Sequence, residues 1–301
     1  MRTNAHLWFV GPALILMVLI LLLPIGIAGG LSLTDYALGN PGANFVGLEN
    51  YSDIFTRSTY ERMFGATFRY VLVVVPLTVG LGLGAALLIT SVTRFGDLYK
   101  TIYFLPVMAA LIAMAIVWEF ALHPTVGLIN NTLESLCGTW AEALVRHGCA
   151  EGFPHWLGDR DYAIWTICFI GIWQGFGFNM VLYLAGLTSI PRELYHAAEM
   201  DGARSGWERF RLVTWPMLGP TTVFVVTISV IRSFQVFDTV EALTDGGPSR
   251  STYVMMYAIY EKAVQQNLMG IGAAITIVFL LFVMVLTLIQ RWLVERRTHY
   301  V

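Results

Sequence analysis

Two long apolar stretches of this 301-residue chain contain polar and small residues that recur at helical spacing. Residues that lie three, four and seven positions apart share one face of a helix. In the first stretch this face gathers glycines, an amide and an aromatic ring, at Gly171, Gln174, Gly175 and Phe178. In the second it gathers two hydroxyls and a guanidinium, at Ser229, Arg232 and Ser233. Amides and hydroxyls can bond the hydroxyl groups of a solute, and glycines beside an aromatic ring offer a wall to a ring-shaped one.

These seven residues are our candidate substrate-binding residues, because polar groups inside a membrane span are costly and usually face a cavity or a partner. The alternative is that Gln174, Ser229 and Ser233 only bond neighbouring helices. Asn179 and Tyr183 lie on a different face of the first stretch and are further candidates for lining a cavity.

Arg232 admits two interpretations. Its guanidinium can bind an anionic solute, such as a phosphorylated or sulfonated polyol. It can also pair with Asp238 or with an acid of a partner chain, as charges within membranes commonly do. We favour pairing, and the sequence leaves the choice open.

The chain contains six apolar segments, and two of them carry these residues. Only 13% of the residues are charged and 56% are hydrophobic, whereas soluble chains carry about 25% charged residues. A helix needs roughly 20 apolar residues to cross a bilayer. The candidates are residues 7–30, 70–91, 101–122, 163–187, 220–240 and 270–289. We therefore predict an all-α integral membrane protein with six transmembrane helices in a single transmembrane domain, residues 1–301.

The first apolar run is longer than the core of a signal peptide, which has about 7–15 residues. We expect it to be a membrane span, with cleavage as the alternative. Arginines and lysines concentrate in the segments that lie inside when both termini are cytoplasmic, so we predict this orientation. Cys137 and Cys149 then fall in an outer loop, where they either pair or stay free thiols. Cys168 lies within a span, as a small packing residue.

The connecting segment 189–216 predicts a compact helix–turn–helix. Ser189 is a candidate N-cap for the first helix, and Gly202 ends or bends it. Leu194, Ala197 and Ala198 share one face. A second short helix is expected at residues 205–213, before Pro216 and Pro220 interrupt the entry to the next span.

This segment resembles the signature cytoplasmic loop of permeases in binding-protein-dependent ABC importers, in which Glu-Ala-Ala is followed by Gly and an apolar stretch with Pro. Here it reads His196-Ala197-Ala198, Gly202 and Leu212 to Pro216. Other motifs resemble the carbohydrate branch of that family, in the first permease of a maltose- or glycerol-phosphate-type pair. They are residues 45–51, 187–191, 233–239, 243–248 and 295–300.

The resemblance implies the type I permease fold of ABC importers, in the bacterial inner membrane. It also implies a coupling helix that docks into an ATPase subunit, with Glu193, His196, Ala197, Ala198, Glu199, Asp201 and Gly202 as coupling residues. His196 replaces the first Glu of the motif, so a charge contact is absent or comes from Glu193 or Glu199. The implied partners are a second homologous permease, two ATPase subunits, a periplasmic or lipid-anchored binding protein, the solute and lipid, without nucleic acid. The seven candidate substrate-binding residues are similar in position to the sugar-site lining of maltose-type permeases, apart from Arg232.

The chain contains no Gly-x-x-x-x-Gly-Lys-Ser/Thr loop, which would cradle phosphates in an ATPase. We expect no enzymatic activity, cofactor or metal site in this chain, with ATP and Mg²⁺ on the partner ATPase. The glycines of residues 80–84 suit close helix packing. The predicted function is alternating-access import of a sugar or sugar-like solute (oligosaccharide, polyol, glycoside, or sulfonated or phosphorylated derivative). The alternative is a secondary transporter driven by an ion gradient, with Asp238 as its ion-binding acid.

Overall fold

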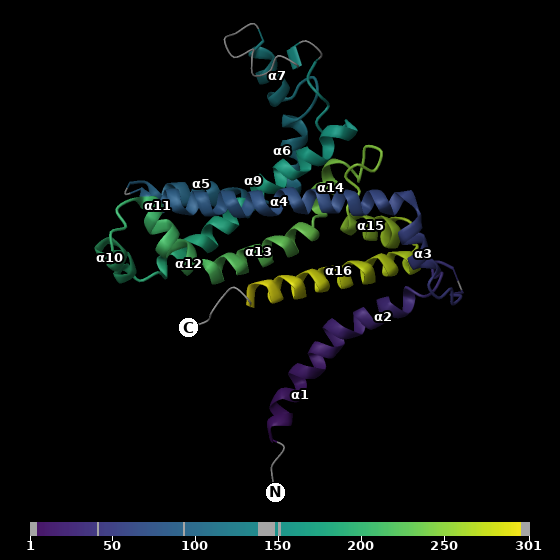
Figure 1. Cartoon of the computed structure of the whole chain (residues 1–301). Coiled ribbons are helices and arrows are strands. Elements are labelled where there is room, and N and C mark those ends of the chain that lie inside the picture. Colours follow the sequence, from purple (N-terminus) through teal and green to yellow (C-terminus); the bar gives the residue numbers. More distant parts are fainter. Residues whose placement is uncertain (1–4, 41, 93, 138–147, 150–151, 296–301) are drawn as a thin grey trace. The chain divides into compact units, whose positions relative to one another are not determined.

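The computed structural model describes residues 5–40, 42–92, 94–137, 148–149 and 152–295 (Figure 1). Within these residues the only β pairing is an isolated bridge between Thr34 and Phe45, which confirms the all-α prediction. Four helices of the described part are long and apolar enough to cross a membrane, and six spans result if each of two bent helix pairs counts as one.

The backbone contacts divide the chain into two compact units. The first combines residues 1–63 with 255–285, and the second combines residues 64–254 with 286–301. The single domain at residues 1–301 therefore stays a prediction. The first unit contains α1 (Ala5–Met17), the π-helix η1 (Val18–Leu22), α2 (Leu23–Leu31), α3 (Glu49–Thr56), α15 (Met255–Tyr260), the π-helix η3 (Glu261–Gln265) and most of α16 (Met269–Glu295).

The first predicted span is the continuous helix from α1 to α2. None of the side chains in its most apolar window is buried against protein, as expected of a helix surrounded by lipid. The loop that follows is fixed by residues of the 45–51 motif. The Asn50 amide donates to the carbonyls of Ser32 and Thr34, each at 2.9 Å, and the Tyr51 and Ser32 hydroxyls lie 2.7 Å apart. The motif therefore attaches α3 to the end of α2.

The second unit contains most of α4 (Ser58–Ser91), the helix that passes from one unit into the other. It continues with α5 (Gly96–Met108), α6 (Leu111–Ala121), α7 (Leu128–Ser135), α9 (Arg160–Thr188), α10 (Arg192–Met200), α11 (Gly206–Arg209), the π-helix η2 (Phe210–Thr214), α12 (Trp215–Met217), α13 (Gly219–Phe234) and α14 (Asp238–Leu243). Helix α9 is its centre, because α5, α13 and α14 all contact it.

Close helix packing of the glycine-rich stretch in α4 is confirmed at Gly82. A Cβ atom there would lie 2.7 Å from Cβ of Asn179 and 3.0 Å from the backbone nitrogen of Met180, so only glycine lets α4 approach α9 this closely. A Cβ at Gly80 or Gly84 would meet nothing within 4 Å. One glycine of the stretch therefore fixes the contact.

The predicted span at residues 101–122 is not one straight helix, and that it crosses the membrane once stays a prediction. Helix α5 ends at Met108, α6 begins at Leu111, and their axes differ by 96°, so α6 turns away from α5 (Figure 1). Ala109 and Ala110 between them are extended. Pro106 lies in the last turn of α5, and its missing N–H weakens the helix just before the break.

The predicted span at residues 220–240 is interrupted near its end. Helix α13 ends at Phe234, and Asp238 opens the separate helix α14. Phe237 between them has a non-helical backbone, with φ −142° and ψ −62°. An acidic side chain is favoured in the first turn of a helix, and Asp238 occupies that place in α14. At its other end, α13 bends by 67° from the helix at residues 206–217, where Pro216 and Pro220 were expected to interrupt the chain.

Candidate solute cavity and coupling segment

The second unit contains a cavity of about 370 Å³. Helices α4, α9 and α13 form its sides, and both breaks described above open onto it, through Val107 and Leu111 at one break and through residues 235–239 at the other. All seven predicted substrate-binding residues line this cavity, together with Tyr70, Val74, Thr78, Val107, Leu111, Asn179, Gln235, Val236, Phe237, Asp238 and Thr239. The fold therefore brings the two predicted helix faces together.

Two of the predicted polar residues present unused hydrogen-bonding groups to the cavity. In the described part of the chain, the Gln174 amide and the Ser233 hydroxyl form no side-chain hydrogen bond with protein. Ser233 is only 5% exposed, yet it lines the cavity. Buried polar groups are normally hydrogen-bonded, so Ser233 is placed to bond a molecule inside the cavity, and the half-buried Gln174 amide is open to the same molecule.

Ser229 behaves differently, because it bonds a neighbouring helix. Asn179 Nδ2 donates to Ser229 Oγ at 2.9 Å, and Oγ lies 3.2 Å from Asn179 Oδ1. Both residues are buried. The helix-bonding alternative thus describes Ser229, and Asn179 joins α9 to α13 while lining the cavity. Tyr183 does not line the cavity; it is fully buried in the packed core of the unit.

Arg232 holds its guanidinium over the ring of Phe178, 3.9 Å from the ring centroid. Within the described residues it forms no ion pair with Asp238, so the internal pairing that we favoured is not found. Asp238 lies on a different helix, α14, because α13 ends at Phe234. Both charged side chains line the same cavity. Pairing with an acid of a partner chain stays a prediction.

Gly171 and Gly175 lie where side chains of α4 pack closely against α9. A Cβ at Gly171 would overlap the Tyr70 hydroxyl, and one at Gly175 would lie 3.2 Å from Cγ2 of Thr78. Tyr70 and Thr78 come from α4 and were missed by the sequence reasoning. A polar pair inside an apolar helix, eight residues apart and therefore close to one face, was the signal that could have found them.

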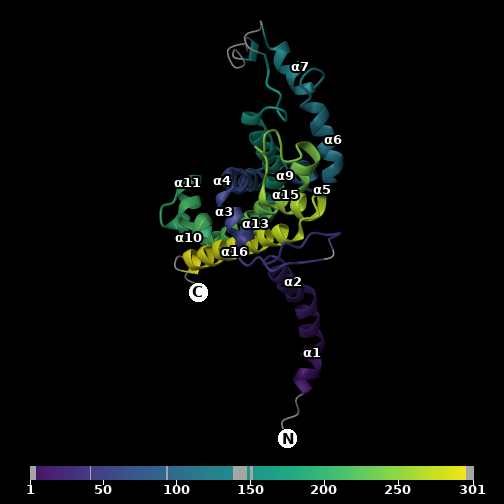
Figure 2. The same ribbon diagram turned by 90° about the vertical axis from the view of Figure 1, so that its right-hand side faces the viewer.

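The predicted coupling segment forms a helix–turn–helix in which α10 and α11 lie side by side (Figures 1 and 2). Gly202 ends the first helix with φ +98°, a conformation that favours glycine. The N–H of Ala203 then donates to the carbonyl of Ala198 at 2.9 Å, and Ala203 is buried. The predicted role of Gly202 as the helix end is thus confirmed.

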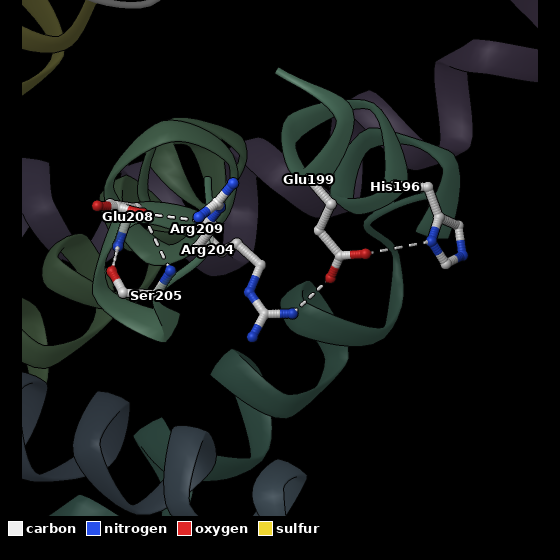
Figure 3. Close-up of polar contacts among 6 residues, drawn as sticks. All are labelled: His196, Glu199, Arg204, Ser205, Glu208 and Arg209. Carbon is white, nitrogen blue, oxygen red and sulfur yellow. Dashed lines mark hydrogen bonds and ion pairs between the residues drawn. The ribbon is translucent and has the colours of Figure 1, made fainter. Parts of the chain in front are cut away.

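The second helix begins with a capping box at Ser205 and Glu208, drawn in Figure 3. The Glu208 carboxylate accepts from the N–H groups of Ser205 and Arg204, at 3.0 and 2.8 Å, and these bonds lower the pKa of Glu208. The predicted N-cap at Ser189 is wrong. Pro191 precedes α10 instead, and the Ser189 hydroxyl donates to the Gly186 carbonyl at the end of α9.

Glu199 is engaged within the segment, as Figure 3 shows. It pairs with Arg209 at 2.6 Å and lies 3.8 Å from His196 Nδ1. Glu193 is exposed and forms no ion pair or hydrogen bond in the described part of the chain. Of the two acids that were expected to replace the missing motif Glu, Glu193 is therefore the one with a free carboxylate.

The faces of α10 differ from the expected arrangement. Tyr195 and Ala198 pack against the unit's core, and the Tyr195 and Thr214 hydroxyls lie 3.0 Å apart. Leu194 and Ala197 are exposed, as is Met200, at 89%. Ala198 therefore does not share an outer face with Leu194 and Ala197. Asp201, in the turn after α10, is also exposed.

Cys137 and Cys149 form a disulfide, with Cα atoms 5.8 Å apart, which decides the question that the sequence left open. Nearby, the Trp156 indole donates to the Asn130 side chain at 2.6 Å. Cys168 is a free, buried thiol, as its predicted packing role requires.

Residues 79–299 match the model of the binding-protein-dependent transport system inner membrane component. The chain belongs to this family, so the resemblance seen in the motifs is confirmed and the protein is an inner-membrane transport component.

The chain is similar along nearly its whole length to known proteins. It is 29% identical to the probable ABC transporter permease protein YurN of Bacillus subtilis, over 94% of this chain and 93% of YurN. It is 30% identical to the sn-glycerol-3-phosphate transport system permease protein UgpA of Pectobacterium atrosepticum, over 96% and 93%.

Two solved structures share the fold. One is a bacterial ABC transporter involved in the import of the acidic polysaccharide alginate, with 22% identity and a TM-score of 0.79. The other is the alginate transporter in complex with alginate pentasaccharide-bound periplasmic protein, with 21% identity and a TM-score of 0.81. Each match covers 98% of both chains. The predicted ABC importer permease fold is thereby confirmed.

Proposed function

We propose that this chain is a solute-conducting permease subunit of an ATP-driven, binding-protein-dependent importer for a sugar or sugar-like solute. The observation that carries the proposal is the cavity between α4, α9 and α13. Polar groups in a membrane span are costly unless they face a cavity or a partner, and here Gln174 and Ser233 face a cavity without a hydrogen-bonding partner among the described residues.

The cavity also lies beside two stretches of non-helical backbone. Exposed backbone groups are tolerated at membrane depth only inside protein or along a water-filled cavity, and broken helices commonly form substrate sites in transporters. Both breaks, at residues 109–110 and 235–237, open onto this cavity. Amide, hydroxyl and aromatic groups suit a polyhydroxylated solute. The names of the similar proteins, which refer to sn-glycerol-3-phosphate and alginate, agree with such a solute.

The coupling segment supplies the proposed link to ATP. With both termini cytoplasmic, α10 and α11 lie on the side of the membrane where ATP is available. We propose that exposed α10, through Glu193, Ala197 and Met200, docks on an ATPase subunit that binds ATP and Mg²⁺. A second homologous permease, a second ATPase and a periplasmic binding protein complete the assembly. ATP binding then moves α10 and opens the cavity outward, and hydrolysis returns it to the inward state.

The test is solute uptake into proteoliposomes that contain the complete complex. The cognate binding protein and labelled solutes are outside, and ATP is either inside or absent. The proposal requires uptake only with both ATP and the binding protein. Uptake that an ion gradient drives without ATP would contradict the proposal and would support the alternative of a secondary transporter with Asp238 as its ion site.

A further inference from the structure

The guanidinium of Arg232 is held in the cavity by one face only. Its central carbon lies 3.9 Å above the centre of the Phe178 ring, which is a cation–π contact. Such a contact uses the flat face of the guanidinium and leaves the five N–H donors, which lie in the plane, available. In the described part of the chain these donors form no ion pair or hydrogen bond.

A guanidinium without a counter-charge is costly inside a membrane protein. Arg232 is exposed in the described part of the chain, so its donors are open to a molecule that enters the cavity, and an oxyanion is the group that they bind most strongly. The acid that lines the same cavity, Asp238, does not pair with Arg232. A contact with the Phe178 ring fixes the position of the guanidinium without neutralising it. Arg232 is thus positioned, charged and open to the cavity.

We propose that Arg232 binds an oxyanion group of the transported solute, which is a phosphate, sulfonate or carboxylate attached to a polyhydroxylated body. This inference rests on the proposed function and specifies its solute class. The fork of N–H donors matches two oxygens of such a group. Arg232 is then the residue that selects anionic over neutral sugars at this site.

The remaining groups of the cavity fit the hydroxylated body of such a solute. The Gln174 amide and Ser233 hydroxyl donate to or accept from hydroxyl groups. The Asp238 carboxylate, on a separate helix, accepts from hydroxyl donors. It also disfavours an anionic group beside itself, because like charges repel. The opposite charges of Arg232 and Asp238 therefore favour an orientation of the solute with its oxyanion toward Arg232.

The experiment compares matched solutes that differ only in charge. The panel contains glucose, glucose 6-phosphate, 6-deoxy-6-sulfoglucose, glucuronate, glycerol and sn-glycerol 3-phosphate. It also contains any solute that copurifies with the cognate binding protein, together with the charged or neutral counterpart of that solute. Thermal shift of the binding protein identifies those it accepts. Uptake of these is measured in proteoliposomes with ATP for the wild type and for Arg232→Gln, Arg232→Lys and Arg94→Gln. Arg94→Gln is the matched control, because Arg94 is exposed between α4 and α5, away from the cavity.

We expect the wild-type complex to import the anionic solutes of the panel. The separate uptake rates of the phosphate, sulfonate and carboxylate solutes show which oxyanion the complex prefers. Losing hydrogen bonds to a charged group predicts about a 10- to 100-fold fall in uptake for Arg232→Gln. Arg232→Lys should fall less, because it keeps the charge but not the fork. Arg94→Gln should match the wild type. ATPase stimulation by the loaded binding protein should persist in Arg232→Gln, since assembly and coupling do not need the guanidinium.

Three results would overturn the inference. In the first, the wild type imports a neutral solute and Arg232→Gln leaves this import unchanged. In the second, Arg232→Gln abolishes neutral uptake and ATPase stimulation together, which would assign Arg232 to an ion pair with an acid of the partner permease. In the third, a loaded binding protein and ATP drive no uptake in the wild type, so the proposed function itself fails.

Discussion

Two serines of α13, one helical turn apart, have different environments although the sequence presents them alike. Ser229 exchanges hydrogen bonds with Asn179 of α9, whereas Ser233 faces the cavity without a protein partner in the described residues. Their common spacing predicted a common face, and the cavity does include both. The hydrogen-bonding partner of each depends on how α9 and α13 are aligned, which spacing along one helix does not define.

This difference predicts opposite effects of the same substitution. Ser229→Ala leaves the buried Asn179 amide unpaired, and hydrogen bonds between membrane helices contribute about 0.6–1.7 kcal/mol. We expect a lower melting temperature of the purified complex for Ser229→Ala. Ser233→Ala should leave the melting temperature unchanged and raise the KM for uptake. Equal melting temperatures for the two variants would contradict the assignment.

The Glu208 carboxylate predicts a pH dependence of the coupling segment. Its backbone hydrogen bonds lower its pKa in the folded state, so its stabilising contribution is present above the unfolded pKa of about 4.3 and is lost as pH falls through the folded pKa. Amide exchange at Ser205, corrected for the intrinsic rate, should therefore be slow at neutral pH and accelerate below about pH 4. In Glu208→Gln the protection should be weaker at neutral pH and independent of pH. Unchanged protection in this variant would exclude the capping box as the cause.

At the scale of elements, the sequence predicted where apolar helices lie but not where they break. An apolar count identifies residues 101–122 and 220–240 as single segments because alanine, valine and phenylalanine are equally apolar in helical and extended backbone. The breaks at residues 109–110 and 235–237 depend on packing around the cavity. The coupling segment was more predictable, since Gly202 and the Ser205–Glu208 pair carry local signals for a helix end and a helix start.

The turn between α10 and α11 predicts that two glycines respond differently to alanine. Gly202 has φ +98°, and a left-handed conformation costs an L-residue roughly 1–2 kcal/mol. Gly206 has ordinary helical backbone with open space at its Cβ position. Gly202→Ala should reduce the solute imported per ATP hydrolysed, while Gly206→Ala should not. Equal coupling ratios for both variants would exclude this turn geometry from energy coupling.

The contact between α4 and α9 gives a second matched pair of variants, Gly82→Ala and Gly80→Ala. At Gly82 an added Cβ would approach Asn179 and Met180 within 3.0 Å, whereas at Gly80 it would meet nothing within 4 Å. Overpacking costs about 1–3 kcal/mol, so Gly82→Ala should lower the melting temperature of the complex. Gly80→Ala should be neutral or stabilising because alanine favours helix. A Gly82→Ala complex as stable as the wild type would contradict this prediction, because α4 and α9 would then have moved apart without loss of stability.

At the scale of the whole molecule, the composition and six apolar segments were enough to predict an all-α membrane protein, and separated motifs were enough for the family. All seven predicted substrate-binding residues line one cavity because period and polarity select a single face of each helix. The contributions of α4, through Tyr70 and Thr78, were not predicted. They depend on the close approach allowed by Gly82, Gly171 and Gly175, which appears only when two helices are placed together.

The central claim is that a solute crosses the membrane through this cavity. Its most direct test is an electron cryomicroscopy structure of the complete complex, with loaded binding protein and an ATP analogue that cannot be hydrolysed. The account predicts solute density between α9 and α13, within hydrogen-bonding distance of Gln174 and Ser233. Solute density that contacts only the partner permease, with the α9–α13 cavity closed by protein side chains, would contradict it.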